Sequence, residues 1–277
     1  MNNNPKIIAE IASCHNGDID LAKKMIKEAA KTGVDIVKFQ SWQSKNVDDR
    51  DPDKKRYESL ELSDEAHYIL KEECKKNGVE FLTTCYDADR IAFLKKLGLK
   101  RVKVASTDLK HFNFLKKLRE NFREIIVSCG MSTEEEIKRA IKLLEKGKYT
   151  IMHCVSVYPC PLQKANMSKL LWLKKNAKSV GYSDHTQGIE AAVFSMGIGA
   201  EYIEKHFTLS REEGGIDAAF SLEPGEMQSL VNESRYAWLA MGKVSYKLSE
   251  EEKKSLVFRR SLYAVKDIRK GQKISGN

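Results

Sequence analysis

Several features that would take a protein out of the ordinary globular class are missing from this sequence. No apolar run approaches the roughly 20 residues that a membrane-spanning helix needs. The first residues, MNNNPKIIAEIAS, lack the charged-then-apolar pattern of a secretory signal. No internal repeat or low-complexity tract is visible either. These absences predict a protein of the cytoplasm that works without a membrane.

Paired cysteines are missing as well. The six cysteines are scattered singly, no two of them form a C-x-x-C pair, and four lie in or beside apolar, strand-like runs. In such surroundings a cysteine behaves as a small hydrophobic residue. We therefore expect reduced thiols, as in cytoplasmic proteins. The cysteines are Cys14, Cys74, Cys85, Cys129, Cys154 and Cys160.

The sequence also lacks a basic block interleaved with aromatic residues, although its net charge is +9. The excess lysines are spread along helical segments such as AKKMIKEAAK and KLLEKGK, where they alternate with acids. A nucleic-acid surface would combine a basic groove with stacking aromatics. We therefore expect no nucleic-acid partner, and infer only that a positive field attracts anionic substrates.

What the 277 residues do contain is an alternation of β-rich runs with helical patterns from one end to the other. Apolar residues at helical spacing, such as Ile137, Ile141 and Leu144, separate the runs. Eight such strands predict a (β/α)₈ barrel, with a doubly wound open sheet as the rival. The candidate strands are KIIAEIA from Lys6, IVKFQ from Ile36, VEFLTTC from Val79, RVKVAS from Arg101, EIIVSCG from Glu124, TIMHCVS from Thr150, SVGYSD from Ser179 and YIEKHFT from Tyr202.

Two segments depart from this pattern. The charged stretch from Ser41 to Leu62 is long for a barrel loop, and is either a solvated excursion or a lid over the barrel mouth. The stretch from Leu248 onward runs past the eighth helix and begins another unit. We therefore expect a catalytic barrel over residues 1–247, followed by a linker and the start of a second domain over 248–277.

Polar residues stand at nearly every predicted strand end, where (β/α)₈ barrels carry their active sites. So many buried polar groups are costly unless they are paired or bind a ligand. They are Glu10, Lys38, Gln40, Lys103, Ser106, Asp108, Ser128, His153, Ser156, Ser183, Asp184, His185, Glu204 and His206.

Two kinds of site are predicted from these residues. His185 and His206 stand at neighbouring strand ends, where two neutral imidazoles can hold one metal ion, although a lone core histidine is more often structural. Lys38 and Lys103 suit a phosphate and a carboxylate, since lysine offers a point charge. The hydroxyls that accompany the lysines are those of Ser106, Ser128, Ser156 and Ser183.

These motifs resemble the sialic acid synthase family, whose members make nonulosonic acids. The resemblance covers nearly the whole chain in order, and SDHT…EKHFT is its most specific part. It implies a (β/α)₈ barrel followed by an antifreeze-like domain, of which only the first residues would be present here. It also implies condensation of phosphoenolpyruvate with an N-acylated aminohexose, loss of phosphate and use of Mn²⁺ or Mg²⁺. The matching stretches are IAEIASCHNGD, VKFQ, FLTTCYDADRIAFLKKLG, VKVASTDL, IIVSCGMSTEEEI, HCVSVYPCP, GYSDHTQGIEAAV, YIEKHFTL and DAAFSLEP.

The resemblance further assigns roles to single residues. It gives His185 and His206 to the metal and the two lysines with their four serines to phosphoenolpyruvate. Glu10 and Asp217 would act on the reacting carbons and on water. The residues near the sugar would be Gln40, Asp108 and Tyr158.

Three departures from the family pattern affect the sugar side. Asp108 replaces a glutamate that many relatives have, Cys85-Tyr86 replaces a common Pro-Phe pair, and the antifreeze-like domain is cut short. In the family that domain reaches across to the partner subunit of a homodimer. We expect a homodimer here too. The last barrel stretch, GGIDAAFSLEP, looks closer to the pseudaminic acid synthase branch.

The main expectation is an acceptor of the N-acetylmannosamine type. The first alternative is a pseudaminic or legionaminic acid synthase acting on a diacetamido-trideoxyhexose. Other readings are a barrel that condenses phosphoenolpyruvate with a phosphorylated sugar, a metal-dependent isomerase or aldolase, and a sugar- or metal-binding subunit without catalysis. A phosphorylated sugar would need a further basic cluster, and only Lys54-Lys55-Arg56 offers one.

Overall fold

The computed structural model describes residues 5–212 and 214–274. Eight parallel strands form a closed barrel in which each strand pairs with its sequence neighbours and β1 pairs with β8, which confirms the predicted fold. The strands are β1 (Lys6–Glu10), β2 (Ile36–Ser41), β3 (Glu80–Cys85), β4 (Arg101–Val104), β5 (Glu124–Ser128), β6 (Lys148–His153), β7 (Val180–Asp184) and β8 (Tyr202–His206).

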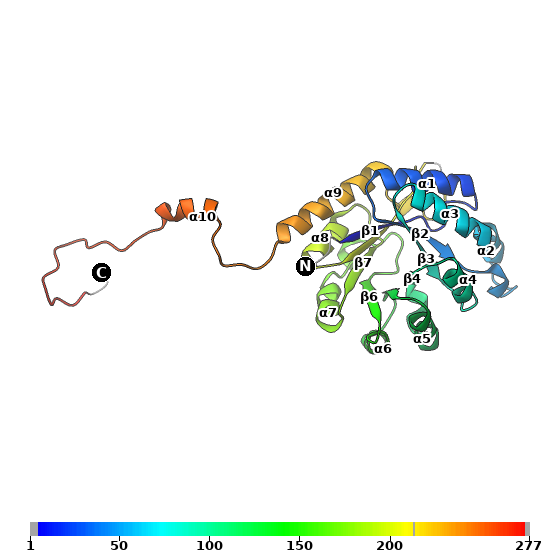
Figure 1. Cartoon of the computed structure of the whole chain (residues 1–277), viewed down its shortest axis with the longest axis horizontal. Coiled ribbons are helices and arrows are strands. Elements are labelled where there is room, and N and C mark those ends of the chain that lie inside the picture. The colour runs from blue at the N-terminus through cyan, green and yellow to red at the C-terminus, as the bar shows by residue number, and fades with distance from the viewer. Residues whose placement is uncertain (1–4, 213, 275–277) are drawn as a thin grey trace. The chain divides into compact units, whose positions relative to one another are not determined.

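One helix after each strand covers the outside of the barrel (Figure 1). The helices have caps at their ends: Thr133 forms a capping box with Glu136 at the start of α6, and Gly33 follows α1 with a positive φ. The covering helices are α1 (Ile19–Lys31), α3 (Asp64–Lys76), α4 (Arg90–Lys96), α5 (Phe112–Asn121), α6 (Glu134–Leu144), α7 (Ser168–Asn176), α8 (Glu190–Ile198) and α9 (Pro224–Met241).

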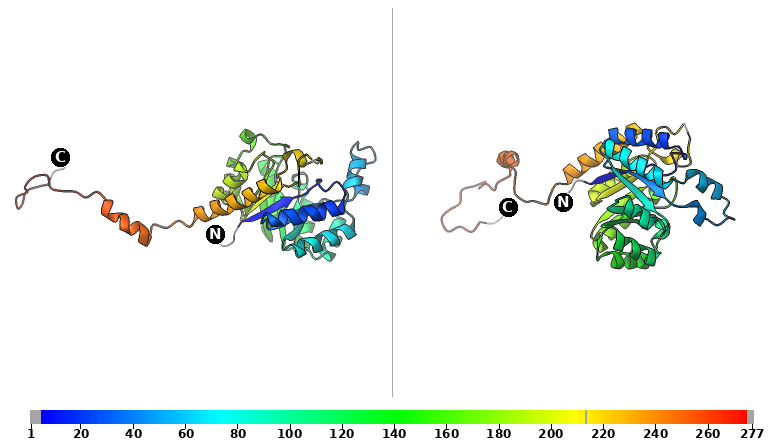
Figure 2. Two further views of the ribbon diagram at one scale, coloured as in Figure 1. Left: turned by 90° about the horizontal axis from the view of Figure 1, so that it is seen from above. Right: turned by 45° about the vertical axis from the view of Figure 1, so that its right-hand side comes forward.

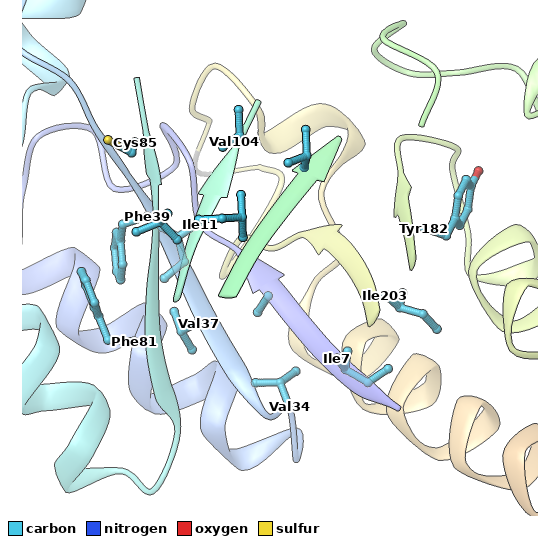
Figure 3. Packing of buried hydrophobic residues seen from close by; sticks show 14 of the residues in the cluster. Ile7, Ile11, Val34, Val37, Phe39, Phe81, Cys85, Val104, Tyr182 and Ile203 are labelled. Atoms are coloured by element: carbon cyan, nitrogen blue, oxygen red, sulfur yellow. The ribbon is translucent and has the colours of Figure 1, made fainter. Parts of the chain in front are cut away.

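The main hydrophobic core lies between the strands and these helices. Outward-facing side chains such as Val37, Phe39 and Ile203 are buried there (Figure 3). A second, smaller cluster lies apart from it and contains Ile8, Ile36 and Leu82, which alternate along their strands with the outward-facing residues. This second cluster therefore fills the inside of the barrel below the strand ends.

The long charged segment after β2 is folded. It contains a 3₁₀ turn (Ser44–Asn46) and the short helix α2 (Lys54–Leu60), and Figure 2 shows it in light blue beyond the ring of helices. The indole N–H of Trp42 donates to the Tyr57 carbonyl at 3.4 Å. The backbone of Ser59 approaches Gly17 closely: a Cβ on Gly17 would lie 2.3 Å from the Ser59 carbonyl oxygen. The Trp42–Tyr57 hydrogen bond stabilises the segment internally, and the approach of Ser59 to Gly17 attaches it to the loop between β1 and α1.

The chain divides into two compact units, residues 1–241 and 242–277. The second unit contains α10 (Glu250–Lys254) and a 3₁₀ turn (Ser255–Phe258), and its described side chains are almost all exposed. The predicted boundary at 247/248 stays a prediction, as does the identity of the second domain. All six cysteines are free and buried. No helix in the described ranges has the length and apolar character to span a membrane.

Candidate active site

The carboxyl ends of the strands surround a cavity of about 300 Å³. It collects polar side chains from all eight strands or the loops that follow them, and eleven of the thirteen predicted site residues line it. These eleven are Glu10, Lys38, Gln40, Lys103, Ser106, Ser128, Ser156, Tyr158, Ser183, His185 and His206.

Two lysines and two glutamates form an alternating charge cluster at the base of the cavity. Lys38 Nζ lies 2.5 Å from Glu10 Oε2 and 3.4 Å from Glu204 Oε2, while Lys103 Nζ lies 3.2 Å from Glu204 Oε1. Lys103 also donates to Ser128 Oγ at 2.7 Å. All four charged side chains are buried. The cluster therefore carries no net charge when all four groups are ionised.

The two glutamates of this cluster differ in their acidity. Burial raises the pKa of Glu10 to about 7, against the lowering effect of Lys38. Burial would raise the pKa of Glu204 too, but Lys103 and Lys38 together lower it to about 2. A pair of carboxyl groups with separated pKa values is typical of acid–base sites. Glu10 is thus able to take up or release a proton near neutral pH.

Small polar side chains gather around Gly130, just after β5. Ser106 Oγ accepts a hydrogen bond from the Gly130 backbone N–H at 3.0 Å and lies 3.0 Å from Cys154 Sγ. A Cβ on Gly130 would lie 2.4 Å from Ser156 Oγ and 2.9 Å from Ser106 Oγ. Only glycine therefore leaves this space open. The hydroxyls are compact donors of the kind that hold a phosphate or carboxylate group.

His185 and His206 face each other, with ring centroids 5.7 Å apart. His185 Nδ1 lies 2.7 Å from the Val155 carbonyl oxygen, which places its proton there and leaves the Nε2 lone pair for a ligand. His206 Nδ1 is buried without a hydrogen-bond partner in the described chain. Burial lowers the pKa of both imidazoles, so both are neutral, as metal ligands must be.

The pair therefore fits a divalent ion, with water or substrate as the remaining ligands. Among residues 5–212 and 214–274, no group of three or more His, Cys, Asp or Glu side chains lies close enough together to hold one metal ion. A catalytic ion with open positions suits such a small protein ligand set.

A second cavity, of about 810 Å³, adjoins the first and shares five lining residues with it: Gln40, Tyr86, Thr107, Tyr158 and His206. The segment after β2 contributes much of its wall, including Trp42 and Tyr57, which pack edge to face at 6.3 Å. We call this space the mouth cavity. Its other lining residues are Ser13, Gln43, Asn46, Val47, Arg56, Leu60, Asp87, Ile216, Asp217 and Phe220.

The two remaining predicted residues lie outside the inner cavity. Asp217 lines the mouth cavity, where its Oδ2 accepts from the Ser13 backbone N–H at 3.2 Å. Asp108 lines neither cavity: its carboxylate contacts Thr107 Oγ1 at 3.0 Å and His111 Nδ1 at 3.1 Å. The roles assigned to both stay predictions. His153, another strand-end residue, faces outward and hydrogen-bonds the Ala165 carbonyl.

Sequence reasoning gave Glu204 no site role, although it contacts both lysines. The available signal was the strand period of two: Glu204 stands two residues before His206 and so shares its inward face. Thr84, Met131 and Cys154 also line the inner cavity without a sequence signal of their own, whereas Tyr86 stands in the Cys85-Tyr86 pair that the sequence singled out.

Comparison with known proteins places this geometry in a family. The NeuB family model matches residues 25–246. N,N'-diacetyllegionaminic acid synthase from Campylobacter jejuni is 38% identical over 96% of this chain and 86% of its own length. Pseudaminic acid synthase from the same species is 33% identical over 97% of this chain and 84% of its own length.

Among solved structures, the N-acetylneuraminic acid synthetase of Leptospira borgpetersenii superposes with a TM-score of 0.89 at 32% identity, covering 94% of this chain and 93% of that one. The span that the NeuB family model matches, residues 25–246, contains β2 to β8 and both histidines of the candidate metal site. The chain therefore belongs to the NeuB family.

Proposed function

We propose that this chain is a nonulosonic acid synthase that joins phosphoenolpyruvate to a diacetamido-trideoxyhexose and releases phosphate. The observation that carries the proposal is the convergence of buried lysines, serine hydroxyls and two neutral histidines at one barrel end. The first relatives reported above act in legionaminic and pseudaminic acid synthesis by name. They favour this acceptor over one of the N-acetylmannosamine type.

Phosphoenolpyruvate would lie in the inner cavity. Lys38 and Lys103 would face its negative groups, and Ser106, Ser128 and Ser156 would donate to its oxygens. In the structure both lysines form ion pairs with glutamates, so a bound anion would interact with ammonium groups that already have a carboxylate partner. Such preformed donors stabilise the phosphate as its bond to carbon breaks, because they need no reorganisation during the reaction.

The sugar would react in its open-chain form. A divalent ion, Mn²⁺ or Mg²⁺, held by His185 and His206 would act as a Lewis acid toward its aldehyde oxygen. C3 of phosphoenolpyruvate forms the new bond to the aldehyde carbon, and positive character develops at C2. Glu10 reaches the same cavity and, when ionised, would stabilise that charge.

Water then adds at C2. Glu10 would take the proton that this water loses, a role that fits its pKa of about 7. Asp217 is the other carboxyl group on hand, at the mouth cavity. The bond between C2 and the bridging oxygen breaks, phosphate leaves with that oxygen, and a 2-keto-3-deoxy nonulosonic acid remains.

The mouth cavity suits an acceptor with acetamido and deoxy-methyl groups, since Trp42, Tyr57 and Phe220 give it an aromatic wall. It does not suit a sugar phosphate. Of the Lys54-Lys55-Arg56 cluster only Arg56 lines it, and Arg56 is paired with Asp53 at 2.9 Å. This arrangement speaks against the reading in which a phosphorylated sugar is condensed.

The test is incubation of the purified chain with Mn²⁺, phosphoenolpyruvate labelled with oxygen-18 in the bridging position, and either N-acetylmannosamine or a diacetamido-trideoxyhexose. We expect labelled phosphate and a product mass equal to the deoxy-keto acid, with the diacetamido sugar reacting faster. Glu10→Gln is the matched variant and should slow the reaction about 100-fold or more.

Three results would contradict parts of the proposal. Label retained in the organic product would exclude the C–O cleavage. A higher kcat/KM for N-acetylmannosamine would restore the acceptor expected from the sequence. Mn²⁺ binding without phosphate release from any sugar would favour a binding subunit without catalysis.

A further inference from the structure

A second buried ion pair lies beside the cavity on the outer face of the barrel wall. Lys205 Nζ lies 2.7 Å from Asp184 Oδ2, and both side chains are 0% exposed. The two residues are register partners at the last rung between β7 and β8. Neither of them lines the inner cavity or the mouth cavity. The proposed reaction therefore makes no direct use of this pair.

The pair is joined to both sides of His185. Asp184, which precedes it, accepts from the backbone N–H and the hydroxyl of Thr186, which follows it, at 2.8 and 3.1 Å. Lys205 donates to the carbonyl oxygen of the same Thr186. Because Lys205 also directly precedes His206, one ammonium group connects the backbones that carry the two imidazoles.

Stability alone is a poor explanation for this arrangement. Two charges lose their hydration when they are fully buried, and apolar residues of similar volume often stabilise a fold equally well. The outer layer around the pair is otherwise hydrophobic, with Tyr182 and Ile203 nearby on the same strands. The Tyr182 hydroxyl donates to Asp184 Oδ1 at 3.1 Å, so both carboxylate oxygens of Asp184 have polar partners in this buried network.

We propose that Asp184 and Lys205 are positioning residues that hold His185 and His206 at the separation needed to share one cation. This role rests on the proposed function, because it presupposes a metal at the histidines. A shift of one strand by one residue in the pairing of β7 with β8 would turn the imidazole of the shifted strand away from the cavity and separate the two rings. The ion pair fixes this register, and the bonds to Thr186 fix the turn that follows His185.

The experiment measures Mn²⁺ binding to the chelator-treated full chain by isothermal titration calorimetry, without any substrate. The main variant is Asp184→Asn combined with Lys205→Met, which removes both charges together and leaves neither buried alone. We expect its Kd for Mn²⁺ to rise about 10- to 100-fold, as for other residues that orient metal ligands. Tyr182→Phe is the milder variant if the double variant does not fold, because it removes only the hydrogen bond to Asp184 Oδ1 and leaves both charges paired, with a rise of about 10-fold.

The matched control is Tyr202→Phe at the opposite end of β8. It deletes buried hydrogen bonds to Glu124 at 2.8 Å and from Arg101 at 2.9 Å, far along the strand from the histidines. We expect it to lower the melting temperature while leaving the Kd for Mn²⁺ unchanged.

An unchanged Kd in the double variant would overturn the positioning role. Equal weakening by Tyr202→Phe would do the same, because the effect would then reflect general loosening of the barrel. A parent chain that binds no Mn²⁺ would instead overturn the metal assignment in the proposed function, and the positioning role with it.

Discussion

Glu204 separates two buried ammonium groups that would otherwise repel each other. Its carboxylate lies 3.4 Å from Lys38 and 3.2 Å from Lys103, and Ser183 donates to it at 3.0 Å. Removing one partner of a buried ion pair leaves the other charge uncompensated, which costs about 3–5 kcal/mol. We expect Glu204→Gln to lower the free energy of unfolding in urea by that amount.

An added anion should reverse part of this loss. Inorganic phosphate would supply negative charge to Lys38 and Lys103 in the variant, so it should raise the melting temperature of Glu204→Gln more than that of the parent chain. Scanning calorimetry with and without phosphate measures the difference. Equal shifts in both proteins would mean that the two lysines do not form the anion site.

Two other buried histidines give the fold a dependence on pH. Burial lowers the pKa of both His15 and His67 from 6.5 to about 4. Above about pH 6.5 both histidines are neutral in the folded and in the unfolded chain, and their contribution to the free energy of unfolding is present in full. As the pH falls from 6.5 to 4 the unfolded chain binds protons that the folded chain does not, so stability is lost, by about 3 kcal/mol per histidine.

Replacement of one of these histidines isolates the effect. His67 lies 5.3 Å from the Phe93 ring and 6.3 Å from the Phe81 ring, so His67→Leu places an apolar side chain among aromatic ones and loses the contact of Nδ1 with the Ser63 carbonyl oxygen at 2.8 Å. Urea unfolding at pH 7.5, 6 and 5 should show a shallower loss of stability for the variant than for the parent. Parallel curves would contradict the assignment of the pH dependence to this residue.

At the scale of elements, the segment after β2 forms one wall of the mouth cavity, where the proposed function places the acceptor. Tyr57 lines the mouth cavity from α2, whereas the inner cavity has no residue from that helix. We expect Tyr57→Ala to raise KM for the amino sugar about 10-fold, the cost of roughly 1.4 kcal/mol of lost contact, while KM for phosphoenolpyruvate stays the same. Steady-state kinetics with each substrate varied in turn gives both constants.

Tyr236→Ala is the control for this prediction, since Tyr236 is an exposed tyrosine on α9 that lines neither cavity. It should change neither constant. If Tyr57→Ala altered both KM values alike, α2 would support the fold of the whole mouth rather than contact the sugar alone.

The elements themselves were largely predictable from the sequence, but the facing of their side chains was not. All eight predicted strands match β1 to β8, because β-branched runs alternate with helical spacing and caps such as Thr133. Strands of a parallel barrel are buried on both faces, so their sequences show no clear alternation. Glu204 and Lys205 are neighbours that face opposite layers, and the sequence distinguishes them only by the position of Glu204 two residues before His206.

The helix α2 and the placement of Asp108 escaped sequence reasoning for a different reason. The segment of α2 packs through a contact that is distant in the chain, the approach of Ser59 to Gly17, and the orientation of Asp108 is set by its contacts with Thr107 and His111. Local propensity carries no information about such contacts. That the residues predicted for a metal and an anion would line one cavity was predictable, because strand ends converge in any (β/α)₈ barrel.

For the whole molecule, the barrel unit contains a complete core of its own. The buried hydrophobic cluster runs from Ile7 to Val231, and α9 ends at Met241, where the first compact unit also ends. Within 242–274 every described side chain is exposed except the half-buried Leu248. We therefore expect trypsin to cleave the native chain after Lys243 or Lys247 and to leave a resistant fragment.

A chain of residues 1–241 should then fold unaided. Loss of the exposed segment removes little buried apolar area, so its melting temperature should stay within about 4 °C of the full chain, the shift that 1 kcal/mol produces in a domain of this size. Circular dichroism and calorimetry of the two chains make the comparison, and mass spectrometry of the tryptic fragment locates the boundary. A truncated chain that unfolds far below the full chain would show that the second unit stabilises the barrel, and cleavage inside α9 would move the boundary toward the core.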